Sequence, residues 1–168
     1  MSAILRFDKH PTVRGNVVIT GGKGALAQAI ATEFSDARWS VEAPGRNELD
    51  VRSQTSVVTY FSNRKVDLLI CAAGITRDEP LIRLSEAWWD EVLETNLDGA
   101  TRCAKAVIEG MLRRKRGHII MISSFSAIHP PKGQTAYAAS KAGLIGLTKA
   151  LATETGPFGI RVNVVLSL

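Results

Sequence analysis

The chain has 168 residues and a formal net charge of +5, with 45% hydrophobic and 22% charged residues. This composition is typical of one globular domain with a sizeable core, and it excludes a disordered or fibrous chain. The longest apolar run, Leu68 to Ile75, is far shorter than the roughly 20 residues of a membrane helix, so no membrane partner is expected. The two cysteines form no CxxC or Cys/His cluster, which argues against a metal site and against a disulfide framework.

Residues 1–14 include the charged side chains Arg6, Asp8 and Lys9. They contain no apolar segment of the kind that a secretory signal needs. We therefore expect a cytoplasmic protein in a reducing compartment.

Short apolar runs alternate with helical patterns along the first part of the chain. Residues 16–20 are predicted to form a buried strand, and apolar residues then recur at helical spacing from Leu26 to Phe34. Further strands are predicted at 39–43 and at 48–51. Ser53 is a suitable N-cap for the helix expected after them.

The same alternation continues through the rest of the chain. In chain order it predicts a strand at 67–72, a helical region capped by Ser85 and reaching about Arg116, a strand at 119–123, a helix at 135–155 and a strand at 162–166. We therefore expect an α/β fold, a doubly wound parallel sheet of about six strands, in a single domain spanning residues 1–168. Open sheets of this kind bind ligands at the carboxyl ends of their strands.

A glycine-rich turn follows the first predicted strand and reads Thr20-Gly21-Gly22-Lys23-Gly24-Ala25. Glycines at this place let the backbone approach a pyrophosphate, and the N-terminus of the next helix supplies unpaired N–H groups. The alternative is a tight turn that binds nothing.

Tyr137 and Lys141 lie four residues apart on a predicted helix and therefore share one face. A lysine ammonium beside a phenol stabilises the phenolate, so the tyrosine could protonate an alkoxide or deprotonate an alcohol. Ser124, at the end of a predicted strand, could hydrogen-bond the substrate oxygen. Taken alone, the Tyr/Lys pair is also compatible with an ordinary solvated helix face.

Together these residues resemble the short-chain dehydrogenase/reductase family over about 16–165, nearly the whole chain. Ser124 precedes Tyr137 by thirteen positions, the usual spacing in that family. The narrower likeness is to 3-oxoacyl-(acyl-carrier-protein) reductases and acetoacetyl-CoA reductases. The likeness is carried by Thr20-Gly21, Asp50-Val51, Cys71-Ala72-Ala73-Gly74-Ile75-Thr76-Arg77-Asp78, Asn96, Ser124, Tyr137-Ala138-Ala139-Ser140-Lys141-Ala142-Gly143-Leu144 and Arg161-Val162-Asn163-Val164-Val165.

The resemblance implies a Rossmann-like fold and a role for each matching residue. Tyr137 is the expected general acid, Lys141 the ligand of the nicotinamide ribose, and Ser124 the partner of the carbonyl oxygen. Asn96 is expected to hold a water that relays protons to Lys141. The residues expected to contact the cofactor are Gly21, Lys23, Gly24, Leu26, Arg46, Asp50, Val51, Ala72, Ala73, Gly74, Tyr137 and Lys141.

The turn after the second predicted strand bears on the choice of cofactor. An acidic residue there favours NAD, whereas a basic one favours the extra phosphate of NADP. The turn contains Arg46, which can bind a phosphate in bidentate fashion, and Lys23 could assist it. Glu42 is expected inside the strand, away from its tip. NADP(H) is therefore favoured over NAD(H), the alternative being that Arg46 is an ordinary surface residue.

The chain departs from the family's pattern at three places. The family's second and third glycines fall on Ala25 and Ala27, and the segment between the second and third predicted strands is too short for the usual helix. After Val165 the chain reads Leu166-Ser167-Leu168, where the family continues with a Pro-Gly turn, a helical substrate lid and a seventh strand. We expect these last elements to be lacking, as in a truncated product or in a fragment that needs a partner chain.

The function expected from this resemblance is NADP-dependent reduction of a 3-oxoacyl thioester, carried by acyl carrier protein or CoA. The alternatives are a catalytically impaired nucleotide-binding or oligomerisation module, and a reductase of another small ketone or alcohol. The basic run Arg113 to Arg116 either docks acyl carrier protein or only complements a helix dipole, and no nucleic-acid partner is expected. We expect a homo-oligomer that forms through the helices carrying 104–111 and 142–151.

Overall fold

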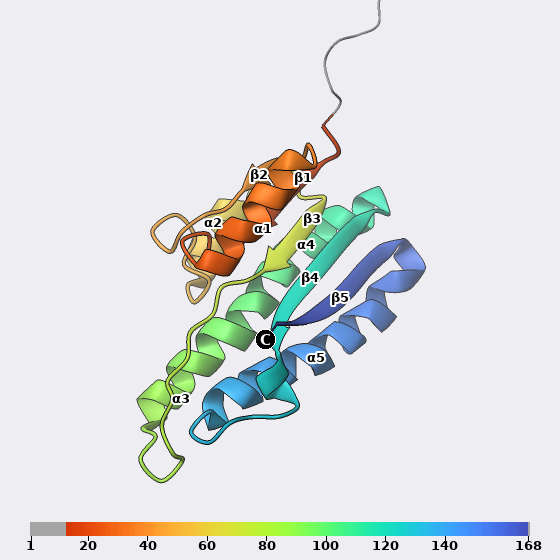
Figure 1. The fold of residues 1–168 in the computed structure, drawn as a ribbon. Coiled ribbons are helices and arrows are strands. Elements are labelled where there is room, and N and C mark those ends of the chain that lie inside the picture. The colour runs from red at the N-terminus through yellow and green to blue at the C-terminus, as the bar shows by residue number, and fades with distance from the viewer. Residues whose placement is uncertain (1–12, 168) are drawn as a thin grey trace, which may run out of the picture.

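The computed structural model describes residues 13–167 and contains a five-stranded parallel sheet (Figure 1). The strand order is β2-β1-β3-β4-β5, so the first strand is the second from one edge and the sheet extends from it in both directions. All four strand pairs are parallel. The strands are β1 (Asn16–Ile19), β2 (Ser40–Glu42), β3 (Leu68–Cys71), β4 (Gly117–Ser124) and β5 (Ile160–Ser167).

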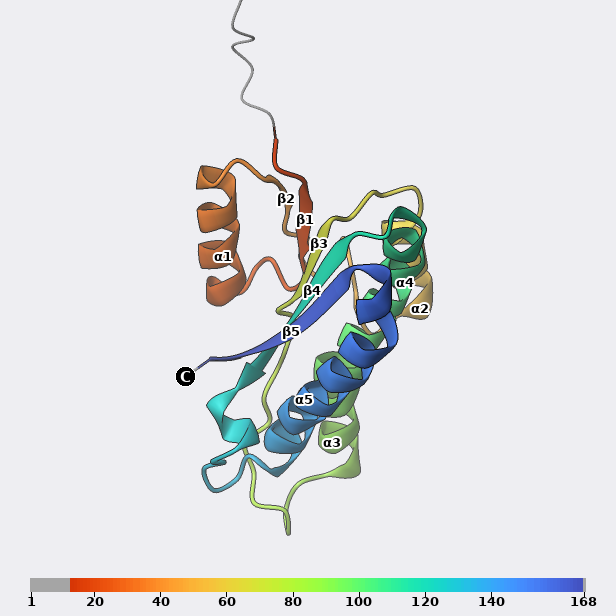
Figure 2. The same cartoon turned by 90° about the vertical axis from the view of Figure 1, so that its right-hand side faces the viewer.

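Helices cover both faces of this sheet. Figure 2 shows α1 on one side of the strands, with the other helices on the opposite side. This arrangement confirms the predicted doubly wound α/β fold. The helices are α1 (Ala25–Asp36), α2 (Gln54–Phe61), α3 (Glu86–Leu93), α4 (Gly99–Arg114) and α5 (Thr135–Thr155).

The predicted strand at 48–51 is wrong, and the described residues form five sheet strands instead of about six. The N–H groups of Glu48 and Leu49 both donate to the carbonyl of Gly45, at 3.0 and 2.9 Å, which closes a turn. Leu49 and Val51 are buried, so their apolar character reflects packing into the core and not pairing in a sheet.

The helical region predicted from Ser85 is present but is not one continuous helix. Ser85 and Ser53 cap α3 and α2 as predicted, since each hydroxyl accepts a hydrogen bond of 3.2 Å from a backbone N–H in the first turn. A π-helical turn, Glu94–Asp98, separates α3 from α4. Turns of this type interrupt the regular ladder of backbone hydrogen bonds and occur frequently at functional sites.

Strand residues alternate between two apolar clusters, one on each face of the sheet. Val17 and Ile19 belong to the cluster under α1, whereas Val18 and Leu69 belong to the cluster under α2, α4 and α5. Burial on both faces explains the nearly continuous apolar runs of these strands.

Two further expectations from the sequence concern a membrane-spanning helix and a secretory signal. Within residues 13–167, no helix is long and apolar enough to cross a membrane. The expectation that the chain lacks a secretory signal rests on residues 1–14, of which 1–12 lie outside the described part of the structure.

Candidate active site

Two adjoining clefts open at the carboxyl end of the sheet, and Ala72, Gly74 and Ile75 line both of them. The first has a volume of about 230 Å³ and the second about 410 Å³. The first is also lined by Gly21, Gly24, Arg46, Leu49, Asp50, Val51, Arg52, Ala73, Glu91 and Thr95. The second is also lined by Leu26, Thr76, Ile122, Ser124, Ser126, Gln134, Tyr137, Lys141 and Ser167.

The glycine-rich turn lies directly against the loops that follow β2 and β3. Gly21 has a φ of +74°, and a Cβ on it would lie 2.7 Å from the Cα of Ala73. A Cβ on Gly22 would lie 1.9 Å from the carbonyl oxygen of Ala43. Both positions therefore require glycine for close packing of the backbone, in addition to any role toward a ligand.

The N-terminus of α1 follows the glycine-rich turn, where the sequence predicts a pyrophosphate site. Gly24 is its N-cap and has extended backbone angles, and no side-chain cap is present among the described residues. Ala27 is only 2% exposed and belongs to the core under α1, so its methyl group does not lie in the turn. Ala25, the other alanine at a family glycine position, is exposed at the first residue of α1. Backbone N–H groups in the first turn of a helix are of the kind that bind a pyrophosphate.

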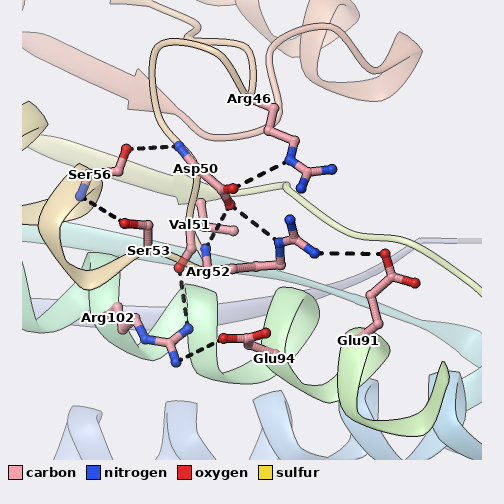
Figure 3. Close-up of polar contacts among 9 residues, drawn as sticks. All are labelled: Arg46, Asp50, Val51, Arg52, Ser53, Ser56, Glu91, Glu94 and Arg102. Carbon is pink, nitrogen blue, oxygen red and sulfur yellow. Dashed lines mark hydrogen bonds and ion pairs between the residues drawn. The ribbon is translucent and has the colours of Figure 1, made fainter. Parts of the chain in front are cut away.

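A row of charged side chains borders the first cleft (Figure 3). The Asp50 carboxylate lies 3.4 Å from the Nε of Arg46 and 3.4 Å from the Nε of Arg52. Arg52 also forms an ion pair with Glu91 of α3, with 3.7 Å between Nη1 and Oε1. Sequence reasoning found Arg46 and Asp50 but missed Arg52, which directly follows the Asp50-Val51 pair, and Glu91, which α3 brings in from a distant segment.

Glu42 is the last residue of β2, so the expectation that it lies inside the strand, away from the tip, is wrong. Its carboxylate accepts hydrogen bonds from the hydroxyl of Tyr60, at 2.9 Å, and from the Nε of Arg64, at 3.0 Å. Burial and this contact with Glu42 raise the pKa of Tyr60 above its ordinary value. Tyr60 and Arg64 thus both engage the carboxylate of Glu42 at the end of β2.

Lys23 and Arg46 approach the same turn from two segments. A Cβ on Gly45 would lie 2.9 Å from the Cγ of Lys23, so the lysine stem covers that glycine. Arg46 follows directly, and its side chain is 67% exposed. Arg46, which lines the first cleft and pairs with Asp50, and Lys23 therefore lie close together at this turn.

Tyr137, Lys141 and Ser124 meet in the second cleft. The Nζ of Lys141 lies 5.5 Å from the centre of the Tyr137 ring and donates a 2.8 Å hydrogen bond to the carbonyl of Ile122. Burial lowers the pKa of Lys141 to about 8. Ser124 is buried and sits at the end of β4, where its hydroxyl accepts from the N–H of Ser126 at 3.2 Å.

Asn96 lies in the π turn behind the strand-end glycine Gly74. Its Oδ1 accepts from the N–H of Ile75 at 2.8 Å, and its Nδ2 donates to the carbonyl of Ile75 at 2.9 Å. A Cβ on Gly74 would lie 3.3 Å from that Oδ1 and 3.5 Å from the Nζ of Lys141. The side chain of Asn96 therefore holds the backbone, and its expected role toward a water stays a prediction.

The basic run at the C-terminal end of α4 is partly engaged in contacts within the chain. Arg113 pairs with Glu109 one helical turn earlier, and Arg114 donates to the carbonyl of Val66 at 2.7 Å. These contacts account for two of the four cations without an external partner.

Known proteins share both the sequence and the fold of this chain. A family model described as short chain dehydrogenase matches residues 48–167. The 3-oxoacyl-(acyl-carrier-protein) reductase of Escherichia coli K12 is 46% identical over 152 residues, covering 85% of this chain and 62% of the relative. The same-named protein of Vibrio harveyi is 33% identical and covers 97% and 65%. The acetoacetyl-CoA reductase of Synechocystis is 36% identical and covers 89% and 69%.

The solved structure of an oxidoreductase of the short chain dehydrogenase/reductase family from Burkholderia thailandensis superposes with a TM-score of 0.87. It is 30% identical, and the match covers 94% of this chain and 70% of the other. The chain spans 62–65% of the length of the two acyl-carrier-protein reductases above. Because the family model matches more than half of the chain, the chain belongs to the short-chain dehydrogenase family.

Proposed function

We propose that the chain carries the cofactor-binding and proton-transferring part of an NADP(H)-dependent reductase of 3-oxoacyl thioesters. The observation that carries this proposal is the shared wall of the two clefts. Gly74 lines both, with the glycine-rich turn in one cleft and Tyr137 and Lys141 in the other. A dinucleotide lying across that wall would have its adenine end near Asp50 and its reactive end near Tyr137.

In this proposal each residue acts on the bound reactants at a stated atom. The nicotinamide ring, when bound, supplies the hydride for the carbonyl carbon. The hydroxyls of Ser124 and Tyr137 orient the carbonyl oxygen, and Tyr137 gives its phenolic proton to that oxygen. Lys141 stabilises the resulting phenolate, because its ammonium lies beside the ring.

The preference for NADP(H) is supported by the charges beside the first cleft. Lys23 and Arg46 offer two cations to a phosphate on the adenosine ribose. Glu42, the acidic group at the end of β2, is occupied by Tyr60 and Arg64. The substrate class is taken from the named activities of the relatives, and acyl carrier protein is the macromolecular partner that those names suggest.

Replacing Tyr137 with Phe tests the chemistry. The variant should lose turnover of an acetoacetyl thioester because no proton reaches the carbonyl oxygen, while it retains affinity for NADPH. NADPH oxidation at 340 nm and a fluorescence titration of the cofactor measure the two quantities. Turnover that persists in Tyr137→Phe would contradict the assigned role. NADPH binding without turnover in the unmodified chain would instead favour a nucleotide-binding module. A panel of small ketones distinguishes a reductase of another small ketone or alcohol from a reductase of 3-oxoacyl thioesters.

Replacing Arg46 with Ala tests the cofactor preference. Loss of a charge-assisted contact should weaken NADPH binding roughly tenfold and leave NADH binding nearly unchanged. Arg113→Ala is a matched control, because Arg46 and Arg113 each pair with an acidic residue four positions away and are 67% and 68% exposed. Equal weakening of both cofactors by Arg46→Ala would contradict the phosphate contact.

A further inference from the structure

A buried set of hydrogen bonds connects Asn96 to the helix that carries Tyr137. Ser140 is 0% exposed, and its Oγ accepts a 3.0 Å hydrogen bond from the Nδ2 of Asn96. The same hydroxyl donates its proton to the carbonyl of Tyr137 at 2.7 Å. With the two bonds from Asn96 to Ile75, three separate segments are joined through two side chains.

The direction of each hydrogen bond follows from the chemistry of the groups. The backbone N–H of Ile75 must donate, so the atom of Asn96 that receives it is the oxygen. The two hydrogens of the amide nitrogen then go to the carbonyl of Ile75 and to Ser140. Ser140 is thus the acceptor for the second amide hydrogen, in a place that excludes water.

The proposed reaction depends on the relative positions of these three joined segments. Gly74 and Ile75 line both clefts, and the first turns of α5 carry Tyr137 and Lys141. Asn96 sits in the π turn between them. A shift of the Ile75 backbone relative to α5 would change where a bound nicotinamide lies relative to the Tyr137 hydroxyl.

We propose that Ser140 is a positioning residue, which through Asn96 fixes the Gly74–Ile75 backbone relative to Tyr137. This inference rests on the proposed function, and it assigns a role to a residue that touches neither reactant. Ser140 acts by accepting the hydrogen bond from Asn96. Without that acceptor the amide nitrogen is left with an unsatisfied N–H, and the amide rotates or the segment holding Ile75 loosens.

Thr148 provides a matched control on the same helix. It is also buried, and its hydroxyl also donates 2.7 Å to a carbonyl of the preceding turn, that of Leu144. The described structure gives Thr148 no hydrogen bond to a segment outside α5. Ser140→Ala and Thr148→Ala therefore remove similar bonds within the helix, and only the first removes the bond to Asn96.

Steady-state kinetics on the unmodified chain and four variants test the proposal, using acetoacetyl thioester and NADPH. Ser140→Ala should lower kcat roughly tenfold, the effect of a small misplacement of the reacting groups, whereas Thr148→Ala should lower Tm without changing kcat. In the Asn96→Ala background, Ser140→Ala should have less than about a twofold effect, because its partner is already absent. The same loss of kcat in both backgrounds, or an equal loss from Thr148→Ala, would overturn the proposal.

Hydrogen exchange provides a readout that does not depend on turnover. The N–H of Ile75 donates to Asn96, so Ser140→Ala should accelerate its exchange at least tenfold in an NMR measurement, with no change in Thr148→Ala. Unchanged exchange overturns the proposal whether or not the chain is active. If the unmodified chain has no turnover but Ile75 responds as expected, the proposed function fails while the positioning link stands.

Discussion

Lys141 is buried, and its ammonium group donates a hydrogen bond to the carbonyl of Ile122. Burial penalises the charged form, which lowers its pKa from the ordinary 10.5 to about 8. Because the unfolded chain binds this proton more tightly, folding is opposed below about pH 8, where both states are protonated. The opposition decreases as the pH rises from about 8 and disappears above 10.5, where both states are neutral.

The stability of the chain should therefore respond to Lys141 in a defined pH window. Lys141→Met removes the charge, so the variant should be more stable relative to the parent at pH 7. That advantage should shrink by about 3 kcal/mol between pH 7.5 and 10.5. Urea unfolding of both chains at each pH measures the difference. A difference that does not vary with pH would contradict the lowered pKa.

Gly22 and Gly24 belong to one turn but differ in the space around them. A Cβ on Gly22 would overlap the carbonyl of Ala43, whereas a Cβ on Gly24 would lie 3.3 Å from its nearest neighbour, the carbonyl of Gly21. Gly22→Ala should lower the free energy of unfolding by about 3 kcal/mol or more, and Gly24→Ala by less than about 1 kcal/mol. Chemical denaturation measures both, and equal losses would contradict the packing argument.

At the scale of single residues, the sequence predicted the reactive groups better than their supports. Tyr137 and Lys141 share a helix face through their spacing alone, and Ser124 ends a strand. Arg52, Glu91 and the bond between Asn96 and Ser140 depend on how separate segments pack together. No local pattern contains that information.

At the scale of elements, strong periodicity gave correct boundaries and weak periodicity did not. The 21-residue helix α5 begins and ends at the predicted residues, Thr135 and Thr155. The π turn at Glu94–Asp98 was not predicted, because one extra residue in a helical turn barely changes the apolar pattern. The segment 48–51 alternates like a strand but lies in a turn that is buried by tertiary contacts.

The cap of α2 offers a test at this scale. The hydroxyl of Ser53 accepts from the N–H of Ser56, so Ser53→Ala should lower the free energy of unfolding by about 1 kcal/mol. Ser62→Ala is the control, because its hydroxyl donates to the carbonyl of Thr59 at the exposed end of the same helix. Its effect should stay within about 0.5 kcal/mol. If the two variants are equally stable, Ser53 contributes nothing as a cap.

At the scale of the whole molecule, the expected association through α4 and α5 stays a prediction. Ala142 is exposed on α5, and Thr32 is exposed on α1, on the other side of the sheet. If copies associate through the helices carrying 104–111 and 142–151, Ala142→Glu should lower the mass measured by light scattering. Thr32→Glu should leave that mass unchanged. A parent chain that is monomeric at working concentration would contradict the prediction.

The two edges of the described sheet differ in a way that bears on handling the protein. β2 is three residues long and is followed closely by Pro44, which limits pairing with another strand. β5 has eight residues, and its outer edge lies next to no other strand of the described sheet. In concentrated or partly denatured samples, the chains should therefore aggregate by pairing along the edge of β5. Asn163→Lys or Val165→Lys should slow this aggregation, because each position is exposed and the buried side of the strand is left intact.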